Sequence, residues 1–158
     1  MNILILYDSE FGNTEQIARE IADTITAPHH VRIVRVQDTT KINAEGINLF
    51  IVGSPTQGGQ PKHTLLTCLN ELPHSSLKNI RVACFDTRFL EKDQNFALKL
   101  LMKTIGYAAP KIADILKQKG GILIVPPIGF IVNGKKGPIA QGELKRVKEW
   151  TKTLLQTN

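Results

Sequence analysis

The sequence has few cysteines and no apolar run long enough to cross a membrane. Its two cysteines, Cys68 and Cys84, have the spacing of neither a disulfide framework nor a metal site. Both have apolar neighbours, so we expect two buried free thiols. Met1 leads directly into a strand-like pattern rather than into a basic segment followed by a long apolar one. We therefore predict no signal peptide and expect a cytoplasmic protein.

Acidic residues are scarce in the second half of the chain. Residues 1–79 hold six Lys/Arg and eight Asp/Glu, whereas residues 80–158 hold fourteen and six, and the formal net charge is +6. A basic half of a chain indicates binding to an acidic protein partner, a membrane surface or nucleic acid, or it only forms solvated helix faces. Aromatics are also few, at 6%, and interleave with no basic stripe, so we predict no nucleic-acid partner. The four histidines lack metal-ligand spacing, and we predict no metal site.

Strand-like and helix-like patterns alternate along the chain. We expect strands at 2–7, 31–36, 47–53, 80–85 and 121–127. We expect helices at 13–26 and 61–72, two helical pieces within 93–119 separated near Gly106 and Pro110, and a last helix with one face formed by Leu144, Val147, Thr151, Leu154 and Leu155. Strands spaced by helices imply right-handed crossovers and a parallel sheet covered on both faces. The prediction is one α/β domain over residues 1–158, a three-layer, doubly wound, five-stranded parallel sheet.

In such a sheet, ligands bind beyond the carboxyl ends of the strands, here the loops 8–14, 54–60 and 86–92. The first contains "SEFGNT" and no Lys or Arg. Gly12 permits a tight turn, and Ser9, Asn13 and Thr14 add neutral hydrogen-bonding groups beside the free N–H groups of the next helix. This combination predicts a phosphate site without a cationic side chain. The alternative is that Asn13 or Thr14 only caps the helix.

Other phosphate-binding motifs do not match. The sequence has no G-x-x-x-x-G-K-[ST], which argues against a nucleoside-triphosphate loop, and no G-x-G-x-x-G after the first strand. A phosphate-accepting receiver domain would need a carboxylate at the end of the third strand. That position reads Gly53-Ser54-Pro55, so a receiver domain is excluded.

Together, these loops resemble those of the flavodoxin family. "SEFGNT" is similar to the loop that holds the FMN phosphate, "GSPTQGG" (53–59) to the loop along the flavin ring, and "CFDTRF" (84–89) to the loop whose amides hold the pyrimidine edge. The resemblance implies the strand order 2-1-3-4-5, bound FMN and electron transfer. It implies these cofactor-binding residues: Ser9, Glu10, Phe11, Gly12, Asn13, Thr14, Ser54, Pro55, Thr56, Gln57, Gly58, Gly59, Asp86, Thr87, Arg88 and Phe89.

The sequence also departs from the family pattern. Gln57 stands where flavodoxins commonly have Trp or another large side chain, which weakens or removes the stack on the inner ring face. Phe89 or Phe11 could supply the outer aromatic, and either could instead pack in the core. Gly58-Gly59 lies where the family's peptide turns its carbonyl toward flavin N5, or forms a plain turn.

Cations near these loops suggest an effect on reduction. The sequence-based hypothesis is that Arg88, with Lys62 or Lys92, stabilises the negative charge of reduced flavin. Asp86 would then oppose this effect or cap the third loop.

Three functions from different classes remain open at this point. The first is an electron carrier between redox partner proteins with acidic docking surfaces, because family members are usually acidic and this chain is not. The second is an FMN-dependent NAD(P)H reductase of quinones or similar acceptors, and the third is a scaffold that has lost its cofactor. The intact first loop favours cofactor binding.

Overall fold

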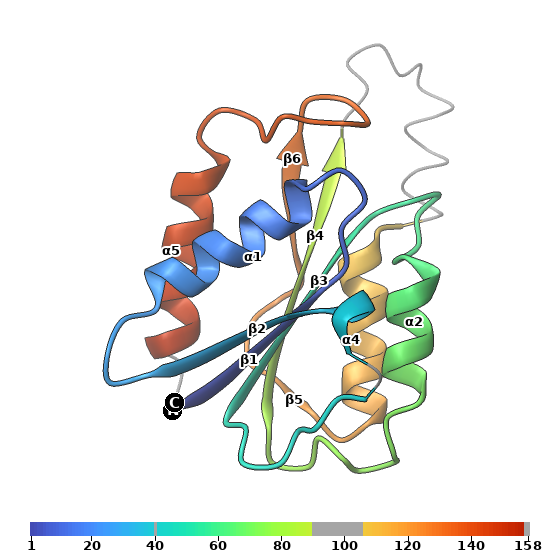
Figure 1. Cartoon of the computed structure of the whole chain (residues 1–158), viewed down its shortest axis with the longest axis vertical. Helices are drawn as coiled ribbons and strands as arrows, with labels where there is room; N and C mark the ends of the chain where they lie inside the picture. Colours follow the sequence, from blue (N-terminus) through green and yellow to red (C-terminus); the bar gives the residue numbers. More distant parts are fainter. Residues whose placement is uncertain (40, 90–105, 157–158) are drawn as a thin grey trace.

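The computed structural model describes residues 1–39, 41–89 and 106–156 (Figure 1). Its strands are β1 (Asn2–Tyr7), β2 (His30–Arg35), β3 (Leu49–Pro55), β4 (Arg81–Phe89), β5 (Ile122–Leu123) and β6 (Ile128–Val132). Its helices are α1 (Asn13–Thr24), the short 3-10 helix η1 (Val36–Asp38), α2 (His63–Asn70), α4 (Ala108–Gln118) and α5 (Glu143–Gln156). The predicted alternation of strands and helices is confirmed.

The strands form one parallel sheet in the order β2-β1-β3-β4-β5, as predicted. The fifth position is divided between two short strands, because Ile122 pairs with Arg81 and Ile128 pairs with Phe85 farther along β4. The prediction of one strand over 121–127 is therefore wrong in extent. Pro126 and Pro127 have no N–H to donate to β4, and pairing resumes only after them.

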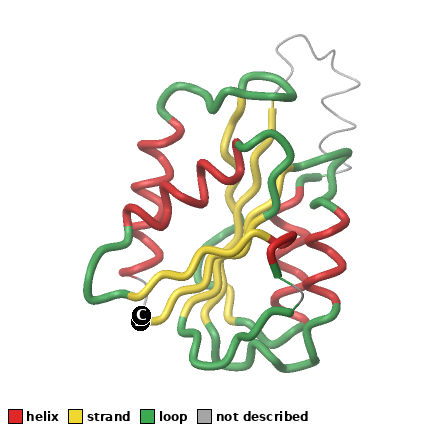
Figure 2. The backbone as a smooth tube through the Cα atoms, in the orientation of Figure 1, coloured by secondary structure: helices red, strands yellow, loops and turns green. Residues whose placement is uncertain are grey.

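Helices cover both faces of the sheet (Figures 1 and 2). Leu4, Leu6 and Phe50 pack with α2 and α4, whereas Ile3 and Ile5 pack with α1 and α5. Alternate residues of one strand thus enter opposite cores, as expected for a strand buried on both faces. In the described part of the chain, no helix has the length and apolar character needed to cross a membrane.

Two strands extend beyond their predicted ends. Ser54 pairs with Asp86 and Pro55 with Thr87, so β3 reaches residue 55 and β4 reaches residue 89. The prediction that 54–55 and 86–89 are loop is wrong, because β3 and β4 pair with each other as far as Pro55 and Thr87, and β6 pairs with β4 as far as Phe89. The first of the two predicted helical pieces, before Gly106, lies outside the described residues, and so does Lys92.

The two cysteines differ in burial. Cys84 is fully buried on β4, and its thiol donates a hydrogen bond to the Ala109 carbonyl at 3.2 Å. Burial raises the pKa of this thiol to about 12. Cys68 is only partly buried, so the prediction of a buried thiol is confirmed for Cys84 and wrong for Cys68.

Candidate functional site

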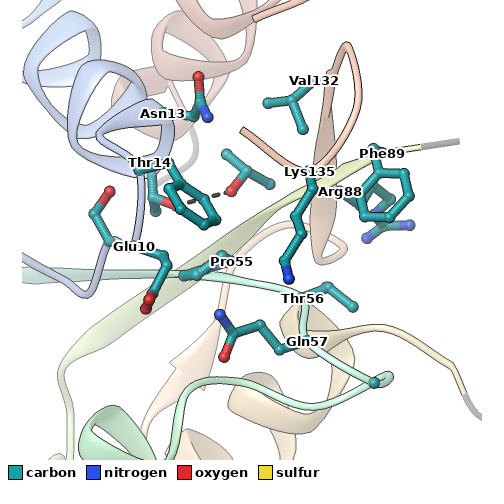
Figure 3. A pocket seen from close by; sticks show the side chains of 14 residues that line it. Glu10, Asn13, Thr14, Pro55, Thr56, Gln57, Arg88, Phe89, Val132 and Lys135 are labelled. Atoms are coloured by element: carbon teal, nitrogen blue, oxygen red, sulfur yellow. Dashed lines mark hydrogen bonds between the residues drawn. The ribbon is translucent and has the colours of Figure 1, made fainter. Parts of the chain in front are cut away.

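A cavity of about 470 Å³ lies at the carboxyl ends of β1, β3, β4 and β6 (Figure 3). Its lining is Ser9, Glu10, Phe11, Asn13, Thr14, Pro55, Thr56, Gln57, Gly58, Thr87, Arg88, Phe89, Val132 and Lys135. All three predicted segments therefore meet at one place. The predicted residues Gly12, Ser54, Gly59 and Asp86 lie in the same segments but do not line the cavity.

The turn before α1 has hydrogen-bond donors to spare. Gly12 is the N-cap, in a left-handed conformation with φ 86°, and no side chain caps the helix from that position. The Ser9 hydroxyl accepts hydrogen bonds from the backbone N–H groups of Gly12 and Glu15, at 3.1 and 3.4 Å. With both lone pairs engaged, this hydroxyl can still donate its proton. The alternative that Asn13 or Thr14 caps α1 is wrong, since Ser9 does so.

Several backbone donors of this turn are unused. The N–H groups of Glu10, Phe11, Asn13 and Thr14 have no acceptor among the described residues. Unpaired N–H groups at a helix N-terminus, together with the helix dipole, attract an anion. The turn thus has the chemistry of a phosphate seat.

Two threonine hydroxyls join α1 to β4 beside this turn. Thr14 Oγ1 and Thr87 Oγ1 are 2.8 Å apart, and the two residues are 1% and 4% exposed. A pair of hydroxyls uses one proton in its mutual bond and keeps the other for a further acceptor. The pair therefore adds one donor to the cavity wall.

The segment after β3 closes in a two-residue turn. Gln57 and Gln60 exchange both backbone hydrogen bonds, at 2.9 and 3.0 Å, and Gly58 and Gly59 between them have φ of 54° and 75°. Two consecutive positive φ values define a type I′ turn, which favours glycine. In this structure the backbone of Gly58 and Gly59 therefore forms a tight turn. Gln57 lines the cavity but offers no aromatic ring for stacking.

At the end of β4 the charged groups bind one another. Arg88 donates two hydrogen bonds of 2.6 Å to the Asp86 carboxylate, and its guanidinium lies 3.6 Å from the centre of the Tyr107 ring. Asp86 also accepts the Ala109 N–H at 2.9 Å, while the Thr56 hydroxyl accepts the Ala108 N–H at 3.0 Å. Asp86 and Thr56 therefore bind the first N–H groups of α4. This arrangement, the closed β4 set, leaves Arg88 largely neutralised.

Lys62 is neutralised in a similar way. Its ammonium pairs with the carboxylate of Glu10 and lies 3.7 Å from that of Asp8, which is fully buried. Asp8 also accepts hydrogen bonds from Gln37, at 2.7 Å, and from Thr64. The hydrogen bond and the charge of Lys62 lower the pKa of Glu10. The cations named in the sequence-based hypothesis, within the described residues, thus already have anionic partners.

Sequence reasoning missed the fourth wall of the cavity, Val132 and Lys135. Both follow from the strand β6, which the sequence prediction did not contain. The usable signal was the apolar run Ile128–Val132 directly before "NGKKGP". If that run is interpreted as a parallel strand, the lysine-rich loop after it is predicted to lie at the carboxyl edge of the sheet, with the other three loops.

These groups fit FMN. The turn and its hydroxyls suit a phosphate, and Phe11, Pro55, Phe89 and Val132 supply apolar surface for a planar ring. The cavity volume lies within the range of about 300–1,000 Å³ that small-molecule sites have.

The comparisons with known proteins agree with this chemistry. The family model described as a flavodoxin domain matches residues 4–119. No curated protein matches the sequence. A flavodoxin structure from the domain Archaea is 17% identical with a TM-score of 0.77, and the match covers 99% of this chain and 97% of that one.

Two further structures give similar values. Flavodoxin 2 from Bacillus cereus is 21% identical with a TM-score of 0.74 over 100% of both chains. Rubredoxin oxygen:oxidoreductase from Desulfovibrio gigas is 17% identical with a TM-score of 0.74, over 98% of this chain and 35% of that chain. At these identities the structures establish a shared fold, and the family model establishes more: the chain belongs to the flavodoxin domain family, with FMN as its cofactor and electron transfer as its function.

Proposed function

We propose that the chain carries electrons between redox partner proteins with FMN held in the cavity described above, its phosphate on the turn 9–14. The observation that supports this most strongly is the row of N–H groups before α1 without acceptors among the described residues. FMN supplies the redox chemistry, and the protein supplies binding and electrostatics. The Ser9 hydroxyl and the Thr14–Thr87 pair would each donate one proton to phosphate oxygens.

The apolar residues would hold the ring. Phe11 is 43% exposed, and Phe89 is partly buried at the end of β4. A flavin ring covered by these side chains would be shielded from water inside the cavity and would stay accessible to redox partners at the cavity mouth. The closed β4 set would keep that wall in place without contributing a net charge.

The proposed partners have acidic docking surfaces. The net charge of +6 and the excess of basic residues after position 80 support this, as do Lys135 and Lys136, both exposed in the loop after β6. Complementary charges chiefly accelerate association, so the electron-transfer rate should fall steeply with added salt. Two unpaired cysteines agree with a reducing compartment, and we propose a cytoplasmic location.

Ser9→Ala tests the phosphate seat. The variant loses a hydrogen bond to a charged group, worth about 1.5–3 kcal/mol, so its Kd for FMN should rise about 10- to 150-fold. Riboflavin, which has no phosphate, should bind both proteins equally. Ser76→Ala is the matched control, because that serine hydroxyl is buried without a hydrogen-bond partner among the described residues and does not line the cavity. Equal losses for FMN and riboflavin would contradict the seat.

Anaerobic mixing with NAD(P)H separates a carrier from a reductase. A carrier keeps its oxidised flavin spectrum with NAD(P)H alone and is reduced once a partner reductase is added. Rapid bleaching by NAD(P)H alone would instead identify an NAD(P)H-dependent enzyme.

A further inference from the structure

One cation at the cavity differs from Arg88 and Lys62. Lys135 lines the cavity, and its ammonium has no carboxylate within ion-pair distance among the described residues. Figure 3 shows its side chain reaching across the cavity with the nitrogen directed toward Thr56 and Gln57. These residues belong to the segment after β3 and line the cavity. The positive charge of Lys135 therefore lies at the cavity wall that this segment forms.

The loop that carries Lys135 is held by hydrogen bonds on both sides. Val132 and Ile139 form an antiparallel bridge, and the Asn133 N–H donates to the Pro138 carbonyl at 2.7 Å. Residues 133–138 are thus the tip of a short hairpin, with Lys135 near its end. A side chain at the tip of a closed hairpin has a more restricted position than one on an open loop.

The same hairpin is fastened to the phosphate turn. The Asn13 side chain donates from Nδ2 to the Lys136 carbonyl at 3.1 Å. Gly137, with φ 94°, lies so close that a Cβ there would be 2.3 Å from Asn13 Oδ1. Asn13, a predicted cofactor ligand, thus also holds the backbone next to Lys135 beside the cavity through its side-chain amide.

We propose that Lys135 is a cofactor-tuning residue whose ammonium stabilises fully reduced FMN relative to oxidised FMN. The inference rests on the proposed function. Reduction by a one-electron donor protein, acting twice, adds two electrons and takes up one proton, so the flavin ring gains one negative charge. A cation beside the ring lowers the energy of that charge and leaves the neutral oxidised ring almost unaffected. The charges of Arg88 and Lys62, by contrast, are offset by their carboxylate partners.

The test measures the potential and the affinity of the cofactor without any partner protein. Lys135→Ala and Lys135→Met should weaken the binding of reduced FMN about five- to tenfold more than the binding of oxidised FMN, as expected for an exposed charge. A tenfold change corresponds to about 30 mV in the two-electron midpoint potential. Lys135→Arg should stay close to the wild type. Midpoint potentials come from anaerobic dithionite titration with reference dyes, and Kd from flavin fluorescence.

Two control variants separate a local charge from net charge. Lys136→Ala removes the adjacent lysine, whose ammonium lies 6.0 Å from the Phe11 ring centre, and should shift the potential less than Lys135→Ala. Lys145→Ala removes a charge from the exposed side of α5 and should not shift the potential. Equal shifts in all three variants, or an unchanged potential in Lys135→Ala and Lys135→Met with FMN bound, would overturn the inference alone. Failure of the wild type to bind FMN would overturn the proposed function as well.

Discussion

The phosphate turn and the end of β4 were both predicted to bind flavin, yet they treat their polar groups in opposite ways. The turn 9–14 keeps several N–H groups without acceptors among the described residues. In the closed β4 set, Asp86, Arg88 and the start of α4 satisfy one another. The unpaired N–H groups of the turn can bind a ligand, whereas the mutually paired groups at the end of β4 stabilise the cavity wall. The contrast shows that polar residues at the carboxyl edge of a sheet have structural as well as binding roles.

The largest effect should come from breaking the closed β4 set. Asp86→Ala leaves the Arg88 guanidinium and the Ala109 N–H without their partner, and removing one member of a buried ion pair costs about 3–5 kcal/mol. Urea unfolding of the protein without cofactor measures this loss. In the double variant Asp86→Ala/Arg88→Ala the cost should be less than the sum of the two single costs. Additive losses would show that the two residues do not act as a unit.

The second-largest effect should be a pH dependence of the free energy of unfolding, caused by the buried thiol of Cys84 on β4. The pKa of Cys84 is raised from 9.0 to about 12 in the folded protein, so the unfolded chain ionises first as pH rises. The stabilising contribution is complete below pH 9 and is lost between pH 9 and about 12. At pH 10.5 the loss should be about 2 kcal/mol.

Cys84→Ser supplies the comparison for this pH dependence. A serine hydroxyl can keep the hydrogen bond to the Ala109 carbonyl but does not titrate in this range. Urea unfolding at pH 8 and pH 10.5 should therefore show a smaller drop in the variant. Parallel pH profiles for the two proteins would mean that Cys84 does not contribute.

Substitutions in the turn at Gly58-Gly59 should change the free energy of unfolding by a smaller amount. Gly58→Ala forces a Cβ into a left-handed conformation and should cost about 1–2 kcal/mol. Gly58→Asn should be close to the wild type, because Asn tolerates this conformation in type I′ turns. Thermal unfolding of the three proteins checks the order, and equal losses for Ala and Asn would rule out the backbone explanation.

The smallest effect concerns Glu10 on the phosphate turn. Its lowered pKa means that pairing with Lys62 favours folding above the unfolded pKa near 4.5, and that this contribution is lost as pH falls through the folded value. Because the carboxylate is exposed, Glu10→Gln should change stability only slightly. An NMR titration of the Glu10 carboxyl should show the lowered pKa in the wild type and a return toward normal in Lys62→Ala. An unperturbed titration in the wild type would contradict the pairing.

The sequence was most informative where local chemistry decides the structure. The alternation of apolar runs and helical stripes predicted the parallel sheet, the resemblance of the loops to flavodoxins implied its strand order, and "SEFGNT" predicted the turn at Gly12. It was least informative where long-range pairing decides. That β4 continues through Asp86 to Phe89 depends on β3 and β6 beside it, and nothing local distinguishes Asp86 as a helix cap from a loop ligand.

The roles of the individual residues toward FMN stay predictions, as does the single domain over 1–158. The missed residue Lys135 shows the same limit as β4, because its position depends on a hairpin fastened to Asn13, and no local pattern in "NGKKGP" indicates that contact.

The bond between Asn13 and the Lys136 carbonyl spans 123 positions of the chain. A phosphate settling on the turn would steady Asn13 and, through it, the hairpin beyond β6. Slower amide hydrogen exchange across residues 133–138 should then signal that the cofactor has been loaded, far along the sequence from the segment that grips it.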